Sequence, residues 1–197
     1  MTDTRAAILA ATRSVVLDRG VAAISTRKVA EEAGVPLSQI HYHFGSKEQL
    51  VLATLDSENA RLLTRQAALY AGDEPLSQQW ATACDYLDDD LASGYVRILH
   101  EMIATGFSHA EVRARVRALF DGWLEVLTTA FRHHQDRGLD LRPFTVEEVV
   151  ALTAASFMGG ELFLLLDRES PSLPVRGALR AVATLIEAAE RAQGVPA

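Results

Sequence analysis

The sequence predicts an all-α protein. Apolar residues recur at a spacing of three or four positions through most of its 197 residues, no stretch alternates apolar and polar residues like a strand, and glycines and prolines fall between the periodic stretches. With 49% hydrophobic residues, a chain of this length buries a sizeable core without disulfides or metals. Its single cysteine, Cys84, excludes a disulfide within the chain.

Four helices are expected in the first 70 residues. Gly20 is a natural stop for the first, and Gly34-Val35-Pro36 is a turn signal after the second. Ser25 or Thr26 can cap the second helix, and Ser46 to Gln49 has the pattern of a capping box that opens the fourth. The expected ranges are about 4–18, 26–33, 37–43 and 46–70.

Five further helices are expected after the linker-like segment Gly72–Pro75. The last two are separated by the turn Ser170–Pro174, and no internal repeat is visible. The expected ranges are about 76–92, 95–105, 109–136, 145–166 and 174–191.

The apolar segment 149–166 comes close to the length that spans a bilayer. Glu161 lies inside it, and a carboxylate in lipid is costly, so we expect a buried helix of a soluble protein and no membrane partner. The adjacent Gly159 and Gly160 would permit close approach by another helix.

The net charge is −7, which argues against a uniformly basic nucleic-acid binder. The distribution is uneven, however: residues 1–50 carry six basic and five acidic groups, a net of +1, and both lysines, Lys28 and Lys47, lie there. Residues 1–20 have no continuous apolar stretch behind a basic start, so we expect a reduced, cytoplasmic protein.

Residues 25–43 follow the order helix, tight turn at Gly34, short helix, which is the arrangement of a helix-turn-helix. Val35, Ile40 and Phe44 would seal its underside, and Lys47 could meet a phosphate at the start of the next helix. None of the outward residues expected on the short helix is acidic, so they suit contact with double-stranded DNA. They are Leu37, Ser38, Gln39, His41, Tyr42 and His43.

The stretch from Ser25 to Leu50, STRKVAEEAGVPLSQIHYHFGSKEQL, resembles the TetR family of bacterial transcriptional regulators. The resemblance covers residues 5–52, and Tyr42-His43-Phe44 followed by Lys47 is its most specific part. It implies a dimeric repressor in which a C-terminal helical domain binds a small effector and forms the dimer.

The resemblance also implies roles for individual residues. Thr26 and Arg27 would touch phosphates, Leu37, Ser38 and Gln39 would face bases, and His41, His43 and Lys47 would anchor the backbone. The family usually has a tyrosine where this chain has His41, so it stays open whether His41 or Tyr42 makes the phosphate contact. An imidazole can reach a phosphate, and protonation would strengthen that contact.

Two other patterns point to chemistry only weakly. The pair His41 and His43 and the cluster His133-His134-Asp136 lack the three or four converging ligands of a metal site. The segment Gly106–Ala110 is similar to a nucleophile elbow but follows a helix, so we expect Ser108 to be an N-cap with Glu111 completing a capping box. We therefore expect no enzymatic activity, no metal and no cofactor.

Large side chains spread along the C-terminal helices could line an apolar effector pocket, although any single one is better explained as ordinary core. The candidates are Trp80, Tyr86, His100, Met102, Phe107, Phe120, Trp123, Phe157 and Met158. They imply a small, largely apolar effector, whose identity the sequence does not give.

Together these observations predict a DNA-binding domain at residues 1–47 and an effector-binding and dimerisation domain at 48–197. The helices at 145–166 and 174–191 would form a four-helix dimer interface, and the helix at 37–43 would read a palindromic operator. The alternatives are a ligand-binding or catalytic helical protein and a regulator that contacts another protein. The sequence leaves open whether the protein represses or activates transcription. It also leaves open whether the pocket lies within one subunit or at the dimer interface.

Overall fold

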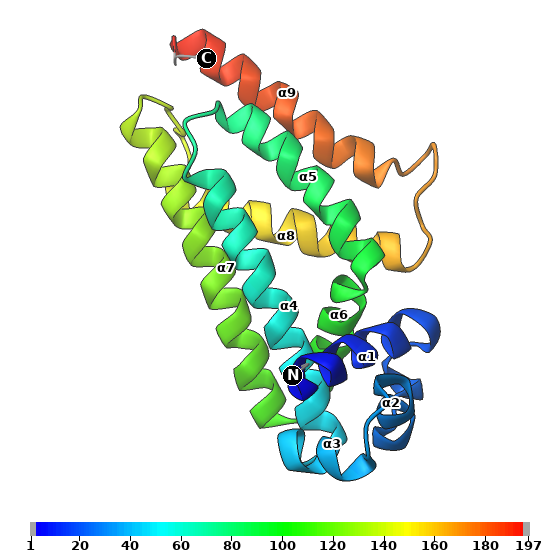
Figure 1. The fold of residues 1–197 in the computed structure, drawn as a ribbon. Coiled ribbons are helices and arrows are strands. Elements are labelled where there is room, and N and C mark those ends of the chain that lie inside the picture. Colours follow the sequence, from blue (N-terminus) through cyan, green and yellow to red (C-terminus); the bar gives the residue numbers. More distant parts are fainter. Residues whose placement is uncertain (1–2, 195–197) are drawn as a thin grey trace. The chain divides into compact units, whose positions relative to one another are not determined.

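A computed structural model describes residues 3–194, the side chain of Ala22 excepted, and its architecture is all-α (Figure 1). Within that range the chain forms helices and one isolated bridge between Ser170 and Leu173. The prediction of an all-α protein is confirmed. The elements are α1 (Thr4–Arg19), the 3-10 turn η1 (Val21–Ala23), α2 (Thr26–Ala33), α3 (Leu37–Phe44), α4 (Lys47–Tyr70), α5 (Leu76–Ser93), α6 (Tyr95–Gly106), α7 (Ala110–Asp136), α8 (Val146–Leu165) and α9 (Val175–Gln193).

Local capping explains why the first helices begin where they do. The Asp3 side chain accepts from the backbone of Arg5 at the start of α1, and Ser25 accepts from Lys28 N at 3.2 Å at the start of α2. The Ser25 cap was predicted, whereas the short turn η1 before it was not.

Two predicted capping boxes form differently. Ser46 accepts from Gln49 N at 3.1 Å, but the Gln49 amide donates to Glu111 Oε1 at 2.9 Å, so only half of that box is present. The prediction that Ser108 caps the next helix is wrong, because α7 begins at Ala110 and the first helical bond runs from Arg113 N to His109 O.

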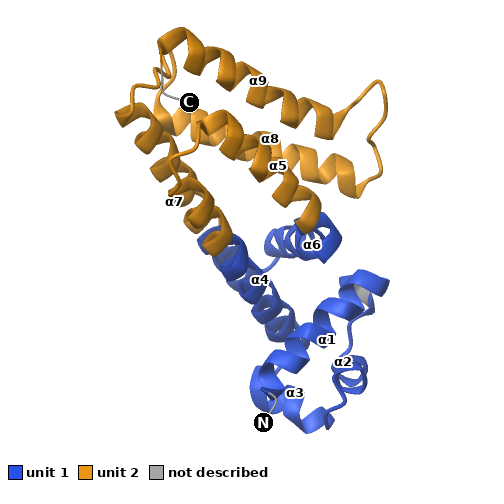
Figure 2. Ribbon diagram, turned by 45° about the horizontal axis from the view of Figure 1, so that its top comes forward, with its two compact units in different colours: residues 1–62, 90–119 blue, residues 63–89, 120–197 orange. Residues whose placement is uncertain are grey.

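The chain forms two compact units, residues 1–62 with 90–119 and residues 63–89 with 120–197 (Figure 2). In the first unit, the C-terminal end of α5 joins α1 through Arg13 Nε, which donates to the Ser93 carbonyl at 2.9 Å. The Tyr95 hydroxyl donates to Asn59 Oδ1 at 3.0 Å. The predicted boundary at residue 47 separates two expected functions, DNA binding and effector binding, and does not coincide with the boundary between the compact units. That functional division stays a prediction.

The second unit has a core to which α4, α5, α7 and α8 contribute. Its buried members are Tyr70, Leu76, Leu127, Ala130, Phe131, Leu139, Val146 and Val150. The two helices α8 and α9 come close at Gly160, where an added Cβ would lie 3.1 Å from Leu179 Cδ1. The close helix approach predicted for the glycine pair is therefore present at Gly160.

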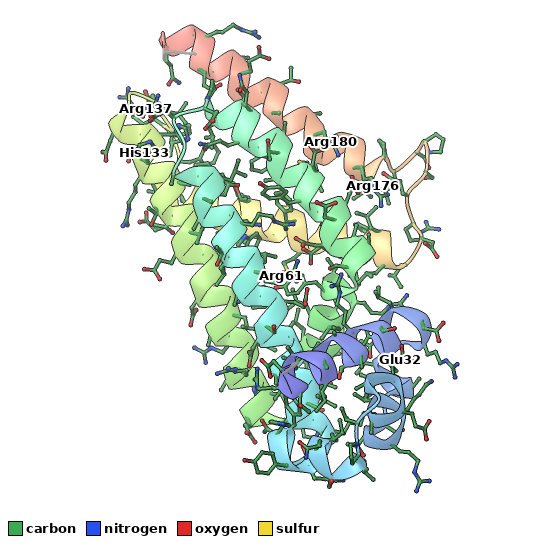
Figure 3. All side chains as sticks on the ribbon, in the orientation of Figure 1. Glu32, Arg61, His133, Arg137, Arg176 and Arg180 are labelled. Carbon is green, nitrogen blue, oxygen red and sulfur yellow. The ribbon has the colours of Figure 1, made fainter. Side chains whose placement is uncertain are left out.

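Polar contacts fasten α9 to α5 along the length of the second unit. Glu190 accepts from Ser77 Oγ at 2.6 Å, and Trp80 Nε1 donates to the Leu179 carbonyl at 2.8 Å. Nearer the start of α9, Arg176 and Arg180 both bind Asp88, and Arg180 also binds Asp85 (Figure 3).

The helix α8 is long and apolar enough to cross a membrane, by length and composition alone. Of its apolar 18-residue stretch, 33% is buried inside the protein. Its inner face, including Thr153, Phe157 and Glu161, is buried. The high hydropathy comes from a second, exposed apolar face that includes Leu152 and Leu162.

A buried polar network closes one end of the second unit. His134 Nε2 donates to Gln79 Oε1 at 2.8 Å, and the Gln79 amide donates to the carbonyls of Leu69 and Gly72. Burial lowers the pKa of His134, and the neighbouring His133 lowers it further. The neutral imidazole is therefore part of the folded structure.

This network makes stability depend on pH. An imidazole in an unfolded chain gains its proton near pH 6.5, whereas folded His134 gains it at lower pH, so the unfolded state binds more protons as pH falls. We expect the free energy of unfolding to decrease from pH 7 to pH 5, and the His134→Gln variant to show a shallower decrease. Urea denaturation at each pH measures both.

The exposed His109 provides a matched control. His109→Gln should keep the pH dependence of the wild-type chain. An equal change of slope in both variants would show that burial of His134 is not its cause.

Candidate nucleic-acid interface

The turn between α2 and α3 sets the direction of α3. Gly34 adopts φ 64° and ψ 32°, a left-handed conformation that side chains with a Cβ rarely adopt. Its N–H donates to Glu31 O, and Val35 N–H donates to Ala30 O at 3.0 Å, so the last carbonyls of α2 are satisfied. The chain then leaves α2 sharply, and Pro36 precedes the first residue of α3.

Two side chains anchor α3 to the rest of the module. Ile40 is fully buried and Phe44 nearly so, whereas the other residues of α3 are exposed or half-buried. The guanidinium of Arg5, on α1, lies 5.5 Å from the centre of the Phe44 ring. One face of α3 is thereby fixed, and the opposite face is presented to solvent.

The outward face of α3 carries the residues predicted to contact DNA. Leu37, Ser38 and His41 are exposed, Gln39 and His43 are half-buried, and Tyr42 is 82% exposed. His41 and Tyr42 therefore both point outward, so exposure alone does not choose between them for the phosphate contact.

The hydrogen bonding of His41 limits what it can offer. Its Nδ1 lies 3.1 Å from the Gly45 carbonyl, and because a carbonyl only accepts, Nδ1 carries the proton. In the neutral ring Nε2 is then a bare acceptor. Only the protonated ring can donate to a phosphate, whereas the Tyr42 hydroxyl donates in its ordinary state.

Three cations of the module lie on α2 and at the start of α4. Arg27 is exposed, Lys28 and Lys47 are half-buried, and Thr26 and Lys47 are the first residues of α2 and α4. Among the residues that the structure describes, no ion pair engages Arg27, Lys28 or Lys47. These charges are free to meet phosphates beside unsatisfied backbone N–H groups at the helix N-termini. The individual DNA-contact roles stay predictions.

The predicted effector-pocket residues divide between the two units. In the second unit, Phe157 lies between Trp80 and Trp123, with ring centroids 5.5 and 6.3 Å away, and Trp123 Nε1 donates to Gln66 Oε1. In the same unit the Tyr86 ring stacks under the Arg65 guanidinium. The half-buried Phe120 and Met158 are also in this unit.

The remaining three candidates, His100, Met102 and Phe107, belong to the first unit. Met102 is buried, whereas Phe107 is 76% exposed. The nine side chains therefore do not form one group within either unit, and their role in effector binding stays a prediction.

A pocket of about 340 Å³ lies within the second unit, between α5, α7, α8, α9 and the loop at 139–144. Trp80 is the one predicted candidate among its described lining residues. Sequence analysis missed the polar residues Thr153 and Ser156, which also line it. The signal in the sequence that could have identified them is the presence of two hydroxyl residues within a strongly apolar helix.

In the described range, no group of three His, Cys, Asp or Glu side chains is placed to hold a metal ion. The geometry at residues 25–47 instead defines a helix-turn-helix DNA-binding module, with a braced second helix and a polar, non-acidic outer face.

Comparison with known proteins agrees with this class. A family model described as bacterial regulatory proteins of the tetR family matches residues 8–54. The chain is 25% identical over 175 residues to the transcriptional regulator EthR of Mycobacterium tuberculosis, covering 87% of this chain and 80% of EthR.

Two solved structures show the same fold. A TetR transcription regulator from Haloarcula marismortui has a TM-score of 0.78 at 19% identity, covering 96% of this chain and 98% of that one. The regulator FadR from Bacillus subtilis, solved in complex with stearoyl-CoA, has a TM-score of 0.71 at 14% identity, covering 90% and 96%. The chain therefore resembles the TetR family of bacterial transcriptional regulators, in its DNA-binding module by sequence and over its whole length by fold.

The left-handed turn offers a direct test of how α3 is positioned. In Gly34→Ala, the added Cβ would meet nothing within 4 Å, so the cost is conformational strain alone, about 1–2 kcal/mol. We expect the free energy of unfolding to fall by that amount in urea denaturation. Gly177→Ala, in the first turn of α9, should not destabilise, because alanine is the better helix former. Equal losses in both variants would contradict the role of the turn.

Proposed function

We propose that this regulator is a cytoplasmic, ligand-responsive homodimeric repressor that reads a palindromic operator through α3. The observation that carries the proposal is the outward face of α3, which is polar and free of acidic side chains, and which is flanked by cations on α2 and α4 that make no ion pair with any described residue. The proposed partners are double-stranded DNA, a second copy of the chain and a small effector; no membrane partner is proposed. Catalysis is not part of the proposal.

An exposed apolar face on α8 and α9 supports the homodimer. Its large members are Leu152, Leu162, Phe163 and Leu166 on or just after α8, and Leu185 on α9. Those on α8 recur at helical spacing, and Gly159 lies in the same stripe with nothing within 4 Å of an added Cβ. A helix that is apolar on both faces needs a partner on each, and α9 supplies one of them.

The relatives support a response to a ligand. FadR from Bacillus subtilis is solved in complex with stearoyl-CoA, so this fold accommodates a small molecule. In the proposed mechanism the effector favours a dimer in which the α3 helices no longer match successive major grooves, about 34 Å apart. A coupling of about 1–3 kcal/mol is typical, and α4, which continues directly from the DNA module, is the proposed lever.

Two substitutions separate the proposed DNA-contact roles. Lys47→Ala should weaken binding to all sequences and reduce the salt slope by about one unit, whereas Gln39→Ala should cost about 1–3 kcal/mol on the operator and relax sequence preference. Mobility-shift titrations at several salt concentrations, on DNA flanking the gene and on unrelated DNA, measure both effects.

Arg132→Ala is the control, because it also removes one positive charge, from an exposed ion pair with Glu147 on α7 and α8. It should leave the salt slope unchanged. The proposed roles fail if Lys47→Ala and Gln39→Ala lose sequence preference equally, and the DNA-binding function fails if the wild-type chain does not prefer any flanking sequence.

A substitution on the apolar face tests the homodimer. Leu162→Glu places a carboxylate where the partner helix would exclude water, so the dimer dissociation constant should rise roughly tenfold or more. Sedimentation velocity over a concentration series measures the change. Leu17→Glu, at an exposed leucine of α1, should leave the dimer intact, and a dimer that withstands Leu162→Glu would place the interface elsewhere.

A further inference from the structure

We infer that the pocket between α5, α7, α8 and α9 binds an uncharged, mainly apolar molecule with one hydrogen-bonding group, and that a second copy of the chain closes its mouth. The pocket of about 340 Å³ is within the range of small-molecule sites. The closure by a second copy rests on the homodimer proposed above; the ligand chemistry rests on the pocket alone.

The hydroxyl of Thr153 is the polar group that points to a ligand. Thr153 is only 5% exposed and lines the pocket, and its hydroxyl has no hydrogen-bond partner among the described residues. Other buried threonines of this chain behave differently: Thr12 and Thr54 donate to carbonyls one helical turn back. A hydroxyl left unpaired in an apolar site gains most from a ligand oxygen or hydroxyl.

The other polar groups of the pocket are already engaged. Ser156 Oγ donates to the Leu152 carbonyl at 2.8 Å, and Trp80 Nε1 donates to Leu179 O. Asp140, at the loop, holds two hydrogen bonds from Arg142 Nε, which keep the pKa of its carboxyl at about 2.

The lining argues for a neutral ligand. No Lys, Arg or His is among the described lining residues, so a carboxylate would be desolvated without a cation partner. A cationic ligand would have to compete with Arg142 for Asp140. A neutral ligand whose hydroxyl or carbonyl contacts Thr153 is therefore favoured over both an anionic and a cationic ligand.

The mouth of the pocket coincides with the apolar face of α8 and α9. Leu152 and Leu185 line the pocket and are 56% and 70% exposed, and both belong to that face. A copy docked there would cover both leucines and remove the mouth from water. Ligand binding and dimerisation would then strengthen each other by the same factor.

Three eight-carbon probes test the ligand class on the full chain: octan-1-ol, octanoate and octylamine. Isothermal titration calorimetry should show octan-1-ol binding at least roughly tenfold more tightly than either charged probe. Tighter binding of octanoate or octylamine would overturn the neutral class, and no binding of any probe would overturn the site.

Matched variants test the role of Thr153. Thr153→Val should weaken octan-1-ol binding roughly threefold to tenfold, and Ala189→Phe, which fills the pocket, should abolish it. Thr128→Val is the control, because Thr128 lies outside the described lining and donates to Leu124 O. Equal affinity in wild type and Thr153→Val overturns the hydroxyl contact.

The closure by a second copy is tested by measuring whether a bound ligand strengthens dimerisation. Saturating octan-1-ol should lower the dimer dissociation constant of the wild-type chain by about fivefold or more in sedimentation equilibrium; an unchanged constant overturns it. Operator binding is measured separately without octan-1-ol, so loss of sequence-specific DNA binding would refute the repressor and leave the ligand results readable.

Discussion

The burial of Ile40 and Phe44 is the constraint on which the DNA module depends. A helix of eight residues is not stable alone, so α3 exists only because these two side chains hold it against its neighbours. The contact also determines which residues of α3 face outward. The proposed contacts with DNA are thus made by residues outside this buried pair, and DNA specificity and stability could vary separately.

The helix ends were predictable where the signal is local. Gly34 ends α2 and Ser25 caps it because both act through backbone groups within a few residues. The capping box at Ser46 was only half right, because Gln49 has a stronger alternative in Glu111, sixty-two positions away. A pattern of four residues contains no information about such a competitor.

The outward face of α3 and the pocket differ in predictability for the same reason. All outward residues of α3 lie within one helix, so its period alone places them on one face. The pocket takes its walls from four helices and a loop, and its one unpaired hydroxyl, Thr153, looks in the sequence like any threonine of an apolar helix. Of the aromatic candidates only Trp80 reaches it, because Trp123 and Phe157 pack together beside it.

The fastening of α9 to α5 has a consequence for biosynthesis. Its polar contacts join residues 88 to 113 positions apart, from Arg176 with Asp88 to Ser77 with Glu190. These contacts of α5 can therefore form only after the last helix has left the ribosome. Every contact within α1 to α3, by contrast, can form once the first 45 residues have left it. The residues of α1 to α3 are therefore complete early in synthesis, whereas the contacts between α9 and α5 form only when translation is almost over.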